Sequence, residues 1–177
     1  AVRKKVHEWT GQNFTDIYVA NINKDTTLSY SGNFSKKVNT KFNESSPIFT
    51  KDGKTMYFTR NNFLNGKKGK SDDKSTFVKI YKATLVNGEW DNITELPFNN
   101  NESSFAHPAL SLDEKTMYFA SDMAGTTGYS DIYKVKRNSD GSFGNPENLG
   151  PEINTTGRES FPSVDKDGNL YFASDGH

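Results

Sequence analysis

The stretch that decides the fold is His107-Pro108-Ala109-Leu110-Ser111-Leu112-Asp113-Glu114-Lys115-Thr116-Met117-Tyr118-Phe119-Ala120-Ser121-Asp122, because related stretches recur at residues 46–60 and 161–175. In each copy a proline opens a short extended run, where its missing N–H is tolerated. A polar Asp-Gly or Asp-Glu turn follows, and then a Met-Tyr-Phe or Leu-Tyr-Phe run of high β propensity. Each copy therefore predicts a β-hairpin, with strands that we call a and b.

A second kind of strand also recurs, and we call it c. It occurs as Asp16-Ile17-Tyr18, Lys79-Ile80-Tyr81 and Asp131-Ile132-Tyr133. A polar turn follows each of these strands, and then a last segment, d, within residues 28–42, 90–98 and 143–153. Glu44, Glu102 and Glu159 mark a period of 57 or 58 residues. Four-stranded units at a fixed period are the signature of a β-propeller.

The predicted fold class is therefore all-β, a β-propeller of four-stranded antiparallel blades. Residues 1–43 form a lead-in and strands c and d of a first blade, residues 44–101 and 102–158 form two blades, and residues 159–177 form strands a and b of a truncated blade. This is about three blades' worth, and propellers have about four to eight, so we expect a fragment of a larger propeller. Both faces of the 116–120 strand are apolar, as expected between two layers, although a β-sandwich remains the structural alternative.

Composition narrows the function classes. The net charge is +0, which gives no reason to expect a nucleic-acid partner, and 13% aromatic residues argue against disorder. The absence of cysteine excludes disulfides and thiolate sites, and no apolar run approaches the roughly 20 residues of a membrane span. The three histidines lack metal-ligand spacing, and there is neither a nucleophile elbow nor a phosphate-binding glycine loop. We therefore expect no cofactor, no metal and no enzymatic activity.

The polar residues that recur in the copies are predicted to stabilise turns and bond to the backbone: Asp16, Ser121, Asp122, Asp131, Ser174 and Asp175. Function is better sought where the copies differ, in the 61–76 insert, the 123–129 loop and the aromatic residues at strand ends. The candidate partner-binding residues are Trp9, Phe63, Trp90, Tyr129 and His107. The alternatives are that the aromatic side chains cover blade edges, and that His107 stabilises a turn instead of facing the central channel.

Pro108, Ser111 and Asp113, followed by residues 118–122 and 128–133, resemble the PD40 (WD40-like) repeats of TolB-type propellers. Residues 144–150 and 171–177 are similar to the propeller segment of OmpA-family envelope proteins. The resemblance implies a periplasmic location at the outer membrane and envelope-protein partners, with peptidoglycan bound only through an OmpA-like domain that is absent here. The unit at residues 44–101 departs from this repeat pattern in two places. Lys79 replaces the aspartate of strand c, and residues 59–61 replace Ala-Ser-Asp.

Two functional hypotheses follow. The first is a non-enzymatic scaffold that binds proteins of the bacterial envelope, with membership of a secretion or gliding complex as one assignment that the resemblance suggests. The alternative is a carbohydrate-binding or glycosidase-type propeller, which needs two carboxylates about 5–10 Å apart in the channel, or a propeller that gates a peptidase.

Overall fold

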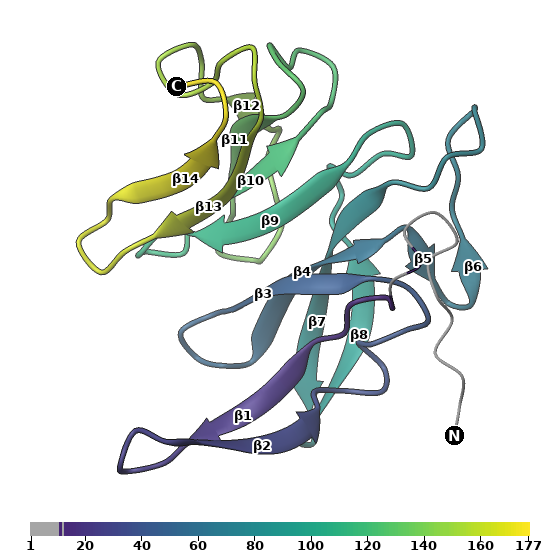
Figure 1. Cartoon of the computed structure of the whole chain (residues 1–177), viewed down its shortest axis with the longest axis vertical. Helices are drawn as coiled ribbons and strands as arrows, with labels where there is room; N and C mark the ends of the chain where they lie inside the picture. Colours follow the sequence, from purple (N-terminus) through teal and green to yellow (C-terminus); the bar gives the residue numbers. More distant parts are fainter. Residues whose placement is uncertain (1–10, 12) are drawn as a thin grey trace.

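The computed structural model describes residue 11 and residues 13–177, which fold into β-strands and contain no helix (Figure 1). The strands are β1 (Tyr18–Ile22), β2 (Leu28–Asn33), β3 (Glu44–Phe49), β4 (Thr55–Asn61), β5 (Phe63–Leu64), β6 (Lys67–Lys68), β7 (Val78–Val86), β8 (Glu89–Glu95), β9 (Phe105–Leu110), β10 (Thr116–Ser121), β11 (Asp131–Lys136), β12 (Glu147–Asn148), β13 (Glu159–Val164) and β14 (Leu170–Ser174).

The strands form two four-stranded antiparallel sheets, in the orders β3-β4-β7-β8 and β9-β10-β11-β12. We refer to residues 44–101 as blade 2 and residues 102–158 as blade 3. The pairs β1-β2 and β13-β14 form two-stranded sheets on either side, and β5-β6 is a small ribbon inserted after β4. The predicted all-β fold of four-stranded antiparallel units is confirmed.

The first strands of successive units are neighbours. Strand β9 lies against both β3 and β13, and Figure 1 shows β3, β9 and β13 in succession along the molecule. Strands β8 and β12 lie at the opposite edges of their sheets. In a propeller the first strand of each blade lines the central channel, so β3, β9 and β13 form the channel side.

Blade 2 is buried on both faces. Met56 and Phe58 of β4 pack in one core with Ile17 and Val38 of the preceding unit. Tyr57, which lies between them in sequence, points into a second core formed with Phe105, Phe119 and Tyr133 of blade 3. Successive strand residues face opposite sides, so one run, Met-Tyr-Phe, supplies two cores. This is why the strand is apolar throughout instead of alternating.

The glutamate period used to align the units is wrong for blade 3. Glu44 and Glu159 each begin a strand, β3 and β13, but Glu102 lies before β9, which begins at Phe105. The equivalent positions are the prolines of the three strands, Pro47, Pro108 and Pro162, at spacings of 61 and 54 residues. The aromatic ring of Phe105 can replace a carboxylate because it points into the core between blades 2 and 3.

An asparagine clasp fixes strand c in each of the three units that contain this strand. In blade 3, the Asn154 Oδ1 atom accepts the Ile132 N–H at 2.7 Å and its Nδ2 atom donates to the Ile132 carbonyl at 3.0 Å. Asn99 binds Ile80 in the same way, at 3.2 and 2.8 Å, and Asn39 binds Ile17, at 2.9 and 2.8 Å. The side chain binds both backbone groups of a residue near the end of the c–d pairing. The carbonyl of that residue also accepts a backbone N–H, for example that of Leu149 at Ile132.

The recurring acids also bond to the backbone. Asp122 accepts the Ser104 N–H at 2.6 Å and Asp175 accepts the Arg158 N–H at 2.5 Å, in each case just before strand a begins. Asn61 takes the same place in blade 2, where its Oδ1 atom accepts the Asn43 N–H at 3.0 Å. The architectural interpretation of these residues therefore extends to the copy that departs from Ala-Ser-Asp.

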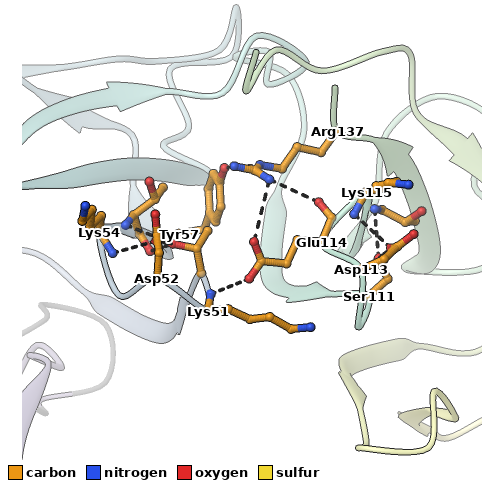
Figure 2. A network of polar contacts seen from close by, with 12 residues as sticks. Lys51, Asp52, Lys54, Tyr57, Ser111, Asp113, Glu114, Lys115 and Arg137 are labelled. Atoms are coloured by element: carbon orange, nitrogen blue, oxygen red, sulfur yellow. Dashed lines mark hydrogen bonds and ion pairs between the residues drawn. The ribbon is translucent and has the colours of Figure 1, made fainter. Parts of the chain in front are cut away.

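Figure 2 shows how the hairpin turns of blades 2 and 3 are joined. The Glu114 carboxylate accepts the Lys51 N–H and lies 4.0 Å from the Arg137 guanidinium, which also donates to the Glu114 carbonyl and, at 3.0 Å, to the Tyr57 hydroxyl. Glu114 has φ 57°, a left-handed conformation that the other two copies give to glycine, Gly53 and Gly168. We infer that these bonds between the blades compensate for the strained backbone.

Candidate functional site

Each strand a has a bulge before its proline. Ser46, His107 and Phe161 occupy this position, and all three have positive φ values, of 50°, 56° and 52°. The strand register shifts at the same places. A left-handed conformation at a bulky residue costs of order 1–3 kcal/mol, and such strain gathers at functional positions. A bulge also turns a side chain out of the regular alternation of the strand. On the channel side, each of these three strands therefore has one side chain whose direction the bulge has changed.

The bulge residues connect neighbouring units. The His107 N–H donates to the Thr59 hydroxyl of blade 2 at 2.9 Å, and the Phe161 N–H donates to His107 Nδ1 at 3.4 Å. The rings of His107 and Phe161 stack with centroids 3.9 Å apart and an interplanar angle of 24°. Burial lowers the pKa of His107, which favours the neutral ring that can accept at Nδ1. Phe161 is nevertheless 61% exposed, so one face of a held aromatic ring meets solvent.

Blade 2 differs from blade 3 in its buried polar residues. In blade 3 the buried Asp131 accepts the Asn148 side-chain amide at 2.7 Å and the Thr127 N–H at 2.9 Å. In blade 2 the corresponding residues are Lys79 and Glu95, which form an ion pair at 2.9 Å. Lys79 is 3% exposed and also donates to Asn101 at 2.8 Å. The departure at Lys79 is therefore matched by a second departure on the neighbouring strand.

Arg60 is a second cation inside blade 2. It occupies the position of Ser121 and Ser174, pairs across strands with Glu44, and is 2% exposed. Its guanidinium lies 4.2 Å from the centroid of the Tyr81 ring, and Nη1 donates to the Val38 carbonyl at 3.4 Å. Its Nε atom is buried and makes no hydrogen bond within the described part of the chain.

The groups around Arg60 titrate abnormally. Burial raises the pKa of Glu44 to about 7, although Thr40 donates two hydrogen bonds to its carboxylate and Arg60 is near. Burial and the charge of Glu95 raise the pKa of Tyr81 to about 12. Burial also lowers the pKa of Arg60. Low polarity is the common cause, and it strengthens any charge interaction that Arg60 makes.

A cavity of about 300 Å³ opens over Arg60, between the preceding unit, the β5-β6 ribbon and β8. Its lining includes Lys37 and Asp91, which pair at 2.7 Å, and the side chains of Phe63, Leu64 and Ile93. The ribbon is held by Asn62, whose amide donates to Asn101 at 2.9 Å and against which a side chain at Gly69 would collide. The cavity combines a buried cation with walls that are partly apolar.

The five candidate residues lie in different places. Phe63 lines the cavity and packs on Phe42, with ring centroids 5.1 Å apart. Trp90 is half-buried against Phe34 and Phe49, at 5.8 and 5.5 Å. Tyr129 is 68% exposed beneath the Arg158 guanidinium, which lies 4.6 Å from its ring centroid.

His107 lies in strand β9 at the bulge, not in a turn, and Trp9 lies outside the described residues. The structure therefore brings Phe63 to Arg60 and His107 to Phe161, but it does not gather the five residues into one site. Their role in binding a partner stays a prediction.

Sequence reasoning missed Arg60, Glu44 and Glu95 as members of one cluster. The sequence carries a signal of this cluster, because Arg60 and Lys79 both depart from the repeat. Among the described residues, no group of three or more His, Asp or Glu side chains is placed to hold a metal ion. No helix long and apolar enough to cross a membrane occurs in that part of the chain.

No protein-family model matches the chain, and no curated protein matches it either. Solved structures do. Puromycin hydrolase aligns with a TM-score of 0.51 and 17% identity over 75% of this chain, and a mutant of that enzyme complexed with PGG aligns with a TM-score of 0.53 and 15% identity over 94%. TolB from Acinetobacter baumannii aligns over 91%, with 20% identity and a TM-score of 0.48.

This chain spans 20%, 25% and 35% of the lengths of puromycin hydrolase, its mutant and TolB, respectively. Likeness at this level of identity concerns the backbone and carries no activity with it. Together with the four-stranded sheets packed face to face, the alignments with puromycin hydrolase and its mutant show that the chain has a β-propeller-like fold.

Proposed function

We propose that the chain is a non-enzymatic, protein-binding propeller module of a bacterial cell-envelope protein, located in the periplasm at the outer membrane. The resemblance of its repeats to PD40 propellers of OmpA-family proteins supports the location. The observation that supports protein binding is the pair of exposed aromatic rings that other side chains hold in place, Phe161 on His107 and Tyr129 under Arg158.

Held aromatic rings are suited to protein recognition. Phe161 and Tyr129 are 61% and 68% exposed, so they offer large apolar areas to a partner. Ring stacking limits the rotamers before binding, which reduces the entropy lost on association. Aromatic and arginine side chains also dominate the residues that contribute most binding energy at protein interfaces. The residues that recur in every unit are occupied by backbone contacts, which leaves recognition to positions that vary.

The test is site-specific photocrosslinking in the intact protein, in cells of its host. A photoreactive amino acid replaces Tyr129 or Phe161, and the matched control replaces Lys24, an exposed residue of the β1-β2 turn. We expect the same envelope protein to be captured from position 129 or 161 and not from position 24. Capture of cytoplasmic proteins only, or no capture from either aromatic position, would contradict the proposal.

A further inference from the structure

The cavity over Arg60 has an unbalanced positive charge. Arg60 and Lys37 both line it, but the carboxylate of Asp91 already pairs with Lys37 at 2.7 Å. Arg60 makes no direct ion pair within the described chain, although the carboxylates of Glu44 and Glu95 attract it at longer range, and its direct contacts are to an aromatic ring and to one carbonyl. A buried cation without a directly paired anion is costly, and an anion bound against the guanidinium would reduce that cost.

The guanidinium still has unused donor capacity. It carries five N–H groups, and the Nε–H has no acceptor. Guanidinium groups bind carboxylates through two parallel hydrogen bonds, with a specificity that an ammonium group does not match. Arg60 therefore offers the type of donor that a carboxylate requires, in surroundings where burial strengthens the interaction.

The walls limit the rest of the ligand. The volume of about 300 Å³ is at the lower end of the range for small-molecule sites. Phe63, Leu64 and Ile93 present apolar side chains beside the polar groups of Thr40 and Asn65, so a short apolar group attached to the carboxylate can pack on this part of the wall. We propose that this cavity binds a carboxylate carried on a small apolar group, with Arg60 as its anchor. The ligand is either a free acid or the C-terminal residue of a protein.

The test compares an acid with its neutral counterpart. The probes are phenylacetate and phenylacetamide, titrated into the protein and followed by NMR. We expect saturable binding of phenylacetate, at least about tenfold tighter than that of the amide. Arg60→Ser should remove this preference, whereas Arg158→Ser, which removes an exposed arginine, should leave it intact. No binding of phenylacetate, or equal binding of the two probes, would overturn the proposal.

A second variant covers the case in which Arg60→Ser does not fold. Leu64→Trp narrows the cavity from the β5-β6 ribbon and leaves Arg60 in place, so it should weaken phenylacetate binding. Unchanged binding in Leu64→Trp would place the ligand elsewhere and overturn the proposal. The source of the carboxylate is distinguished by the peptide Gly-Gly-Phe and its amidated form. Tighter binding of the free-acid peptide than of phenylacetate identifies a protein C-terminus, and the reverse order identifies a free acid.

These results are independent of the photocrosslinking test. That test concerns Tyr129 and Phe161, neither of which lines the cavity. Failure of one proposal therefore leaves the other standing.

Discussion

Blades 2 and 3 have the same strand order, but they bury different polar groups. Blade 3 places Asp131 beside the Asn148 amide, whereas blade 2 places Lys79 beside Glu95. At the end of strand b, blade 3 has Ser121 and blade 2 has Arg60. The comparison shows that the fold fixes where a polar group is needed, while its charge can change provided that its neighbour changes too.

Exchange of one partner alone should have the largest effect. In Lys79→Asp, a carboxylate faces Glu95 inside the blade, and we expect a loss of about 3–5 kcal/mol in the free energy of unfolding. Adding Glu95→Asn recreates the aspartate–amide pair of blade 3 and should restore most of the loss. Urea denaturation of the two variants measures this. If the double variant is no more stable than the single one, the two blades do not use equivalent pairs.

The asparagine clasps should differ in strength. Asn154→Ala leaves the N–H of the buried Ile132 without a partner, while the Ile132 carbonyl keeps the Leu149 N–H at 3.2 Å, and we expect a cost of about 2–3 kcal/mol. Asn99 is only half-buried, so Asn99→Ala should cost less, about 1–2 kcal/mol, because water can reach part of the site. Denaturant unfolding of both variants checks the order. A larger loss for Asn99→Ala would show that burial does not set the strength of the clasp.

Glu44 and Glu159 should give opposite pH dependences. Each accepts two hydrogen bonds from a threonine four residues before it, Thr40 or Thr155. Burial raises the pKa of Glu44 to about 7, so its contribution is full below the unfolded pKa of about 4.5 and is lost as pH rises to about 7, a change of up to about 3 kcal/mol.

Burial also acts to raise the pKa of Glu159, but the hydrogen bonds from Thr155 and Ser174 outweigh it and lower the pKa. The contribution of Glu159 is therefore present above the unfolded pKa and is lost as pH falls through the lowered value. Stability is measured against pH for the parent, Glu44→Gln and Glu159→Gln. Slopes of the same sign for the two glutamates would contradict these assignments.

The smallest effect is expected at the turn that joins the blades. Glu114→Ala removes the carboxylate contacts with Lys51 and Arg137, keeps the bond from Arg137 to the backbone carbonyl and keeps the left-handed backbone, so we expect a loss of about 1–2 kcal/mol. Glu114→Gly removes the same bonds but relieves the backbone, which should recover about 1 kcal/mol. Thermal unfolding compares the two variants. If the alanine variant is the more stable, the backbone at this turn is not strained.

The sequence was sufficient to predict the all-β class and the four-strand unit, because apolar strands and turn residues are local signals. It misaligned blade 3, because Glu102 resembles Glu44 in its neighbours although Phe105 occupies the equivalent place in the strand. The clasps could not be predicted, since Asn99 and Asn154 lie 19 and 22 residues beyond the isoleucines that they bind, on the far side of strand d.

The cluster around Arg60 escaped prediction for a related reason. Arg60, Glu44 and Glu95 lie on β4, β3 and β8, and only the pairing of strands brings them together. When each residue is considered alone, a departure from the repeat suggests that an interaction present in the other units is missing. Paired departures on neighbouring strands indicate instead that a different interaction has replaced it. Phe63 was a candidate from the sequence because it lies in the insert, and the insert does supply one wall of the cavity.

The most direct test of the account gives blade 2 the polar residues of blade 3, through the combined variant Arg60→Ser, Lys79→Asp and Glu95→Asn. Urea unfolding is measured with and without phenylacetate for the variant and the parent. We predict cooperative unfolding of the variant within about 2 kcal/mol of the parent, with a shift of the midpoint by phenylacetate in the parent only. Loss of cooperative unfolding, or an equal phenylacetate shift in both proteins, would contradict the account.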